Sequence, residues 1–127
     1  MITLALFGEA EKGSFRTPLL IHSLFQLSDT LGNPPEDSQG LLFAIQALLY
    51  RRSLVFFRVE QEGFSIEDYF AGFHLLKTKK ISPKIDALCL PGVGNKELLD
   101  AADPLCKTHK SFLVITEKDL YDYLTEK

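Results

Sequence analysis

Two short segments of the chain combine glycines with carboxylates, and each follows an apolar run. Residues 91–97 read Pro-Gly-Val-Gly-Asn-Lys-Glu, and residues 8–14 read Gly-Glu-Ala-Glu-Lys-Gly-Ser. Glycines let a ligand approach the backbone closely, and the unpaired N–H groups that begin a helix attract anions. Both segments therefore predict a site for a phosphate or carboxylate at the end of a strand.

Carboxylates in the two segments are the candidates for catalysis. A carboxylate that faces a ribose stabilises a developing oxocarbenium charge, which makes Glu97 the first candidate. Glu9 is the second, as a general base or as a partner of ribose hydroxyls. The remaining predicted ligand-binding residues are Gly8, Glu11, Gly13, Ser14, Gly92, Gly94, Asn95 and Lys96. A simpler interpretation makes Glu97 a first-turn helix charge and Glu9 and Glu11 solvated loop charges.

The histidines and cysteines do not form a metal-binding pattern. His22, His74 and His109 are widely separated in the sequence. Cys89 and Cys106 lack the spacing of metal ligands or of a redox pair. We expect reduced core thiols, no metal and no cofactor.

Length and charge limit the class of protein. The 127 residues fit one domain, residues 1–127, that buries its own hydrophobic core. A formal net charge of −3 argues against a nucleic-acid partner, since phosphate neutralisation needs a basic face. The beginning of the chain lacks the basic region of a secretory signal, and the longest apolar stretch, residues 41–50, is too short to span a bilayer. We expect a cytoplasmic protein without a membrane partner.

An alternation of strand and helix patterns positions the two segments. Strands are expected at residues 2–7, 53–60, 85–90 and 111–116, and helices at residues 15–31, 39–52, 65–80, 95–109 and 119–126. This order predicts an α/β, Rossmann-like three-layer sandwich of about four parallel strands with helices on both faces. The loops that follow the four strands then share one edge of the sheet, where ligands bind in this architecture.

Three details belong to the first two helices. Pro18 suits the first turn of the helix over residues 15–31, and Asp37 or Ser38 suits the cap of the next helix. Gly40, early in that second helix, indicates a close approach by another backbone. Residues 41–50 are apolar almost all round, which predicts a buried helix, and they are also the expected contact of a homodimer.

Residues 86–100, Asp-Ala-Leu-Cys-Leu-Pro-Gly-Val-Gly-Asn-Lys-Glu-Leu-Leu-Asp, resemble a shortened Pro-Gly-Gly-x-Gly-Thr-x-x-Glu motif. That motif belongs to the LOG, or "lysine decarboxylase-like", phosphoribohydrolases of the Rossmann-like nucleotide-binding superfamily. Residues 39–48 and 110–115 are similar to a helix and to the last strand of the same family. The resemblance implies a pocket for a nucleotide or phosphosugar, with hydrolysis or transfer at the anomeric carbon of the ribose.

The chain departs from this family at positions that matter for catalysis. The second motif glycine is missing or replaced by Val93, Asn95 stands where a threonine is expected, and the family's catalytic Arg-Lys pair has no counterpart. These departures support a second hypothesis from another class. In it the chain is a non-enzymatic interaction or scaffold protein that keeps the fold without a working pocket.

Overall fold

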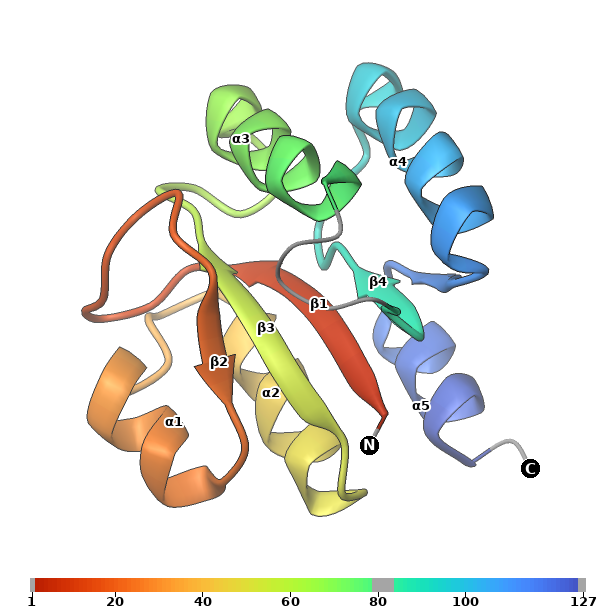
Figure 1. Cartoon of the computed structure of the whole chain (residues 1–127). Helices are drawn as coiled ribbons and strands as arrows, with labels where there is room; N and C mark the ends of the chain where they lie inside the picture. Colours follow the sequence, from red (N-terminus) through yellow and green to blue (C-terminus); the bar gives the residue numbers. More distant parts are fainter. Residues whose placement is uncertain (1, 79–83, 126–127) are drawn as a thin grey trace.

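The computed structural model describes residues 2–78 and 84–125. In this part of the chain the elements follow in the order β1 (Thr3–Gly8), β2 (Leu19–Ile21), α1 (Leu24–Leu31), α2 (Gly40–Leu49), β3 (Ser53–Arg58), α3 (Ile66–Lys77), β4 (Ala87–Cys89), α4 (Lys96–His109), β5 (Phe112–Val114) and α5 (Glu117–Thr125). Helices α1, α2 and α5 cover one face of the sheet, and α3 and α4 cover the other (Figure 1). The predicted three-layer α/β architecture is therefore confirmed. The expected ends at Lys80 and Glu126 lie outside the described residues.

The strands form a sheet in the order β2-β3-β1-β4-β5. Strand β1 is central, and it pairs in parallel with β3 on one side and with β4 on the other. Strand β5 continues the parallel set beyond β4. The carboxyl ends of these four strands therefore lie along one edge, as the sequence predicts, and this edge carries the loops after Gly8, Arg58, Cys89 and Val114.

The predicted helix over residues 15–31 is wrong in its first half. Leu19–Ile21 form β2, which runs antiparallel to β3 at the edge of the sheet. Helix α1 begins only after Ser23, whose hydroxyl accepts a hydrogen bond from the Gln26 N–H at 3.1 Å, and Pro18 therefore lies before a strand. Pairing with β3 satisfies backbone groups that would otherwise line an open strand edge, so tertiary pairing overrides the helical spacing of the leucines.

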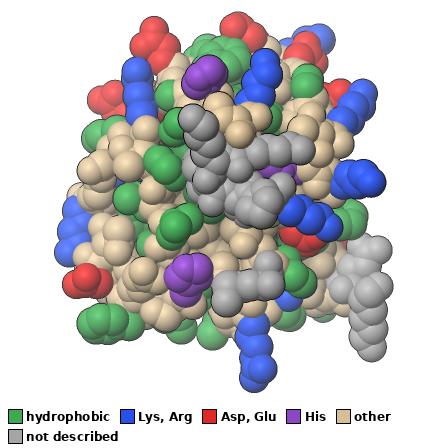
Figure 2. Space-filling model, in the orientation of Figure 1, with side chains coloured by type: hydrophobic (Ala, Val, Ile, Leu, Met, Phe, Trp, Pro, Cys, Tyr) green, Lys and Arg blue, Asp and Glu red, His purple; other side chains and the backbone are tan. Residues whose placement is uncertain are grey.

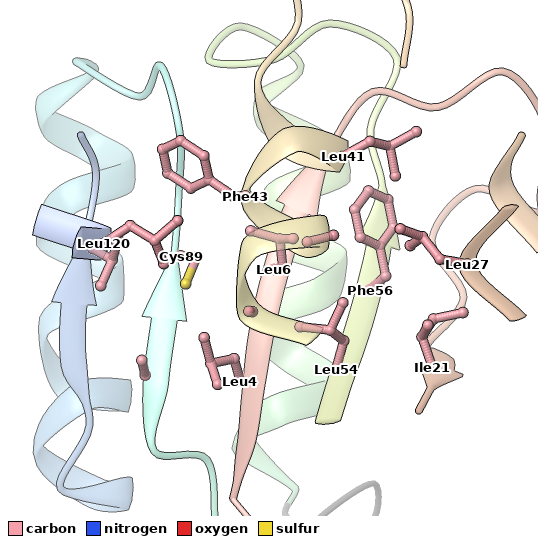
Figure 3. Close-up of a cluster of buried hydrophobic side chains, with 14 of the residues drawn as sticks. Leu4, Leu6, Ile21, Leu27, Leu41, Phe43, Leu54, Phe56, Cys89 and Leu120 are labelled. Atoms are coloured by element: carbon pink, nitrogen blue, oxygen red, sulfur yellow. The ribbon is translucent and has the colours of Figure 1, made fainter. Parts of the chain in front are cut away.

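One layer of the core lies between the sheet and α2. Leu6 and Phe56 of the central strands pack here with Leu41 and Phe43 of α2 (Figure 3). The prediction that this helix is buried holds for that side only, because Leu42 and Leu49 are exposed. The outward side of α2 is thus apolar and uncovered.

The other layer is built around stacked aromatic rings. Phe7 of β1 stacks on Phe57 of β3 and on Tyr69 of α3, with ring centroids 4.7 and 5.4 Å apart. A Cβ on Gly72 would lie 2.3 Å from the Phe7 ring, so a glycine lets α3 approach the sheet. This packing fixes the position of α3 and of the loop that leads into it.

Both cysteines are free thiols, and Cys89 is fully buried in β4. Burial raises the pKa of the Cys89 thiol, which keeps it protonated and unreactive, as expected of a core residue. Over α3 and α4, acidic and basic side chains are interspersed on the surface that Figure 2 shows. Among the described residues, every helix falls short of the length and apolar character that crossing a bilayer requires.

Candidate functional site

Two adjoining cavities lie at the carboxyl edge of the parallel strands. One of about 370 Å³ is lined by Glu9, Asp37, Gln39, Gln61, Glu62, Phe64 and Gly92. The other, of about 440 Å³, is lined by Gly63, Phe64, Ile66, Gly92, Gly94 and Asn95. Because Phe64 and Gly92 line both cavities, we treat the two as one site and call it the edge cleft. Its volume is in the range of ordinary small-molecule sites.

Phe64 is the most unusual residue of the edge cleft, because its side chain is 76% exposed. It follows β3 in a loop whose backbone is held firmly by side chains. The backbone N–H groups of four consecutive loop residues each donate to a side-chain oxygen. Glu60 donates to Asp68 at 3.0 Å and Gln61 to Ser65 at 2.7 Å. Glu62 donates to Glu9 at 2.9 Å and Gly63 to Tyr69 at 2.7 Å. An exposed ring on a fixed loop is presented to solvent without contributing to the core.

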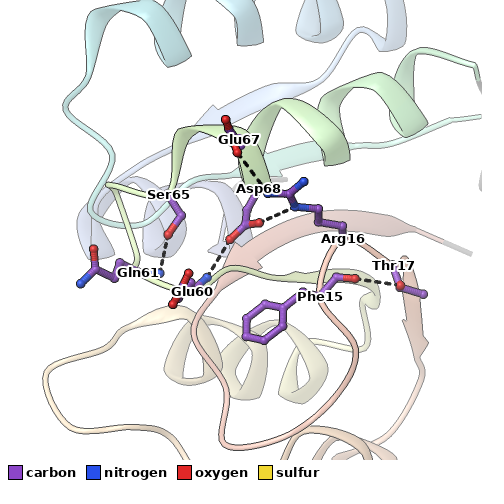
Figure 4. Close-up of polar contacts among 8 residues, drawn as sticks. All are labelled: Phe15, Arg16, Thr17, Glu60, Gln61, Ser65, Glu67 and Asp68. Atoms are coloured by element: carbon purple, nitrogen blue, oxygen red, sulfur yellow. Dashed lines mark hydrogen bonds and ion pairs between the residues drawn. The ribbon is translucent and has the colours of Figure 1, made fainter.

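The Asp68 carboxylate anchors the start of this loop from the first turn of α3. One of its oxygens accepts the Glu60 N–H, and the other accepts from Arg16 Nε at 2.7 Å (Figure 4). Asp68 is buried, whereas the Arg16 side chain is 51% exposed, so only the carboxylate end of this ion pair is removed from water. The loop after β1 and the loop after β3 are thereby joined on the α3 side.

The end of the loop rests on the β4 segment. Gly63 adopts a φ of +84°, and a Cβ there would lie 2.4 Å from the Gly92 carbonyl oxygen, so only glycine fits. Its N–H donates to the Tyr69 hydroxyl, which is buried beneath it, and burial raises the pKa of that phenol. The contact brings the loops after β3 and β4 together beneath Phe64.

Glu9 and Glu62 hold each other's backbone across the edge. Glu62 Oε1 accepts from the Glu9 N–H at 2.9 Å, and Glu9 Oε2 accepts from the Glu62 N–H at 2.9 Å. The Glu62 carboxylate also accepts from the N–H groups of Gln39 at 2.9 Å and Gly40 at 2.7 Å. The Asp37 or Ser38 cap predicted for α2 is thus replaced by Glu62, a residue distant in the sequence.

This arrangement fills one of the two predicted anion positions. A carboxylate bound to the N–H groups after β1 and at the start of α2 occupies the place that a phosphate would need. Gly8 lies directly behind it, because a Cβ on Gly8 would be 2.7 Å from the Gly40 Cα and 2.9 Å from Glu62 Oε1. The close backbone approach predicted at Gly40 is confirmed, and its partner is Gly8.

The second anion position, at the start of α4, is also occupied by the chain itself. Asn95 Oδ1 accepts from the N–H groups of Glu97 at 2.8 Å and Leu98 at 3.2 Å. Lys96 reaches Asp100 at 2.8 Å on the helix surface. Glu97 is exposed in the first turn and lies outside the residues that line the edge cleft.

The structure brings together only some of the predicted site residues. Glu9, Gly92, Gly94 and Asn95 line the edge cleft, and Gly8 supports it from behind. The others point elsewhere: Glu11 accepts from the Asn33 N–H at 3.1 Å, the Gly13 carbonyl accepts from Arg58 at 2.6 Å, and Ser14 is exposed outside the lining. The loop after β1 therefore leaves the cleft after Glu9.

Sequence reasoning missed the contribution of the loop after β3. Phe64, Gln61 and Glu62 line the edge cleft, although only the position of their loop at this edge is predictable from the strand order. An aromatic residue in a sequence is ordinarily assigned to the core, so its exposure gives no advance signal. Gln39 and Asp37 were also not predicted to line the cleft, because they reach it from the residues just before α2.

The edge cleft is acidic on the side of Glu9, Asp37 and Glu62. Among the described residues, its lining holds neither lysine nor arginine. A phosphate beside these carboxylates is repelled, whereas hydroxyl, amide and amine groups find acceptors. The described residues also contain no cluster of three or more histidine, cysteine or acidic side chains placed to bind a metal.

A separate cavity of about 300 Å³ lies between α3 and α4 and is lined by Phe70, Phe73, His74, Lys77, Ala101, Pro104, Leu105 and Thr108. Its lining includes none of the sheet-edge loops. The edge cleft is the stronger candidate, because ligands of open α/β sheets bind at the carboxyl ends of the strands.

Comparisons with known proteins assign no family to this geometry. No protein-family model matches the chain, and neither a curated protein nor a solved structure matches it. The functional interpretation therefore depends on the edge cleft itself.

Proposed function

We propose that the protein binds a small ligand of the nucleoside or nucleotide class in the edge cleft. The observation that carries this proposal is the exposed Phe64 ring, which lies on a fixed loop and lines both cavities of the edge cleft. A base that stacks on such a ring gains about 1–3 kcal/mol. The loop is already ordered by its hydrogen bonds, so binding loses little conformational entropy there.

The polar side chains beside Phe64 suit the sugar of such a ligand. Glu9 and Asp37 offer carboxylate oxygens to ribose hydroxyls, and the carboxamides of Gln39 and Gln61 supply both donors and acceptors. Phosphate is the component that this side of the cleft suits least, because it would face the same carboxylates. We therefore propose that a free nucleoside binds more tightly than its 5′-monophosphate or a phosphosugar.

The proposal concerns binding, and of the two predicted catalytic residues only Glu9 is placed to contact such a ligand. Glu9 lines the cleft, whereas Glu97 does not. One Glu9 oxygen is already engaged by the Glu62 N–H. If N-glycosidic hydrolysis accompanies binding, Glu9 is the carboxylate we assign to it, and Glu9→Gln should abolish it.

The experiment is a calorimetric titration of the protein with adenosine, uridine, ribose, adenosine 5′-monophosphate and ribose 5-phosphate. We expect a nucleoside to bind, and Phe64→Ala to weaken it by about tenfold or more because the stacking surface is lost. Phe64→Tyr keeps the ring and should retain binding. Phe25→Ala is the matched control, since Phe25 is exposed on α1 and lies outside the edge cleft.

Retained binding in Phe64→Ala would contradict the proposed site, and tighter binding of the phosphorylated compounds would contradict the proposed preference. Failure of every compound to bind a folded protein would favour the scaffold hypothesis. That hypothesis has its own support, because Glu62 and Asn95 fill both predicted anion positions. Large apolar side chains such as Phe25 and Leu49 are also exposed.

A further inference from the structure

The outward side of α2 carries an apolar stripe. Leu42, Ile45 and Leu49 recur at i, i+3 and i+7, which places them on one side of the helix. Leu42 and Leu49 are exposed and Ile45 is half-buried, while Leu41, Phe43 and Ala44 face the core. The sequence of α2, Gly-Leu-Leu-Phe-Ala-Ile-Gln-Ala-Leu-Leu, contains no charged residue. Ile45 also packs against the core of its own chain, whereas the exposed surfaces of Leu42 and Leu49 are left uncovered by the described residues.

Charges of opposite sign lie at the two ends of the stripe. Glu36 and Asp37 precede α2 and are exposed, and Arg51 follows the helix and is exposed. Arg52 is engaged within its own chain, because it donates to the Tyr50 carbonyl at 2.8 Å and lies over the Tyr123 ring. The acidic end and the basic end are therefore each available to a partner.

We propose that the cover of this stripe is a second copy of the chain, with the two α2 helices packed antiparallel about a two-fold axis. In this arrangement each apolar stripe meets its own counterpart, as an isologous contact requires. Glu36 of one copy then faces Arg51 of the partner subunit, twice in the dimer. A parallel arrangement would place like charges together, so the charge pattern selects the antiparallel one.

The antiparallel arrangement also agrees with the physics of the helices themselves. Each α2 has ten residues, so the contact runs along about 15 Å of helix. The opposed macrodipoles of the two helices attract rather than repel at both ends. Removal of Leu42 and Leu49 from water on both copies supplies the apolar part of the association.

The first test is the mass of the full chain in solution, measured by sedimentation velocity over a range of concentrations. We expect a dimer for the wild type, and a monomer for Leu49→Glu because a charge then replaces an apolar side chain of the stripe and lies near the acidic end of the partner helix. Phe25→Glu is the control, since this even more exposed apolar residue lies on α1, outside the stripe. Circular dichroism checks that each variant is folded.

The second test separates this arrangement from other dimers. Glu36→Arg and Arg51→Glu should each weaken association by about tenfold, because each places like charges opposite each other. The double variant should restore it, since the pair is then reversed. A monomeric wild type at every concentration, a dimer that survives Leu49→Glu, or a double variant that stays weakened would each overturn the proposal.

Discussion

The Glu62 side chain holds together two segments at the carboxyl edge of the sheet. Its carboxylate accepts hydrogen bonds from the N–H groups of Glu9, Gln39 and Gly40, at 2.7–2.9 Å. These donors come from two separate segments, the loop after β1 and the first turn of α2. One side chain thereby caps α2 and fixes the cleft wall at the same time.

Glu62→Gln should destabilise the fold by about 2–3 kcal/mol. The carboxamide has one acceptor oxygen in place of two, so the Gln39 N–H loses its acceptor, and the bonds from the Glu9 and Gly40 N–H groups lose the charge of the carboxylate. Chemical denaturation of the wild type and the variant measures the loss. Glu67→Gln is the control, because the side chain of Glu67 is 87% exposed and its contact with Arg16 is weak at 3.5 Å. Equal stability of Glu62→Gln and the wild type would show that the capping role is wrong.

Residue types alone indicate that the carboxyl edge of the sheet carries hydrogen-bonding side chains, but not which groups those side chains bind. Asn95 and Glu62 are suited to hydrogen-bonding backbone N–H groups, and this is what they do. From the sequence, those N–H groups are instead predicted to bind a ligand. For Glu62 nothing in the local pattern shows that a residue from another loop will fill the position, whereas the Asn95 cap is local and asparagine is a residue type that caps helices. The pairing of Glu9 with Glu62 spans 53 residues and is a tertiary feature.

At the scale of elements, the crossing of α2 over the end of β1 depends on two glycines. A Cβ on Gly40 would lie 2.7 Å from the Gly8 Cα and 2.7 Å from Glu62 Oε1. No rearrangement of a flexible side chain relieves the first of these contacts, since it involves backbone. The helix must therefore move away from the strand if either glycine acquires a side chain.

Gly40→Ala should accordingly lower the free energy of unfolding by about 1–3 kcal/mol, although alanine is the better helix former. The matched control is Gly94→Ala, where an added Cβ meets nothing within 4 Å. We expect this control to be close to neutral in urea denaturation. A Gly40→Ala protein as stable as the control would contradict the close approach of the two backbones.

The start of α5 gives a prediction for pH dependence. Asp119 accepts from the N–H groups of Thr116 at 3.1 Å and Ile115 at 3.2 Å, and the Thr116 hydroxyl accepts in return from the Asp119 N–H. These bonds, first that of Thr116, lower the pKa of Asp119 below its ordinary value. A lowered pKa means that the stabilisation is present above the ordinary value and is lost as the pH falls through the folded-state pKa.

Asp119→Ala should therefore cost about 0.5–1 kcal/mol near neutral pH, a modest amount because the carboxylate is exposed. The difference from the wild type should begin to shrink as the pH falls below the ordinary aspartate pKa of about 3.9, and it should disappear once the pH is below the lowered pKa of the folded state. Asp122→Ala, which removes only the surface pair with Lys118, is the control and should cost less than Asp119→Ala. A cost for Asp119→Ala that stays constant from neutral to acidic pH would rule out this capping role.

Long elements were predictable, and a short edge strand was not. The patterns of β1, β3 and α4 are strong enough locally to give their type and approximate bounds. Leu19–Ile21 form a strand only because β3 offers them a free edge, which is a property of the assembled sheet. The leucine spacing in that region is real, but it serves α1 only from Leu24 onward.

At the scale of the whole molecule, the edge cleft results from sheet order. Strand β1 lies between β3 and β4, so the loops after all three meet at one place. The sequence predicts that these loops share an edge, but not that Gly63 rests against Gly92 beneath an exposed Phe64. That juxtaposition depends on the order of the strands, which the alternation of elements leaves open.

The most direct test of the account is a titration of isotopically labelled protein with adenosine, followed by the backbone amide shifts in nuclear magnetic resonance spectra. We expect saturable shifts at Gly63, Phe64, Gly92 and Gly94, with the cavity between α3 and α4 unaffected. Shifts confined to the lining of that cavity, such as Phe70 and Thr108, would contradict the account. Spectra unchanged at saturating adenosine would contradict it equally.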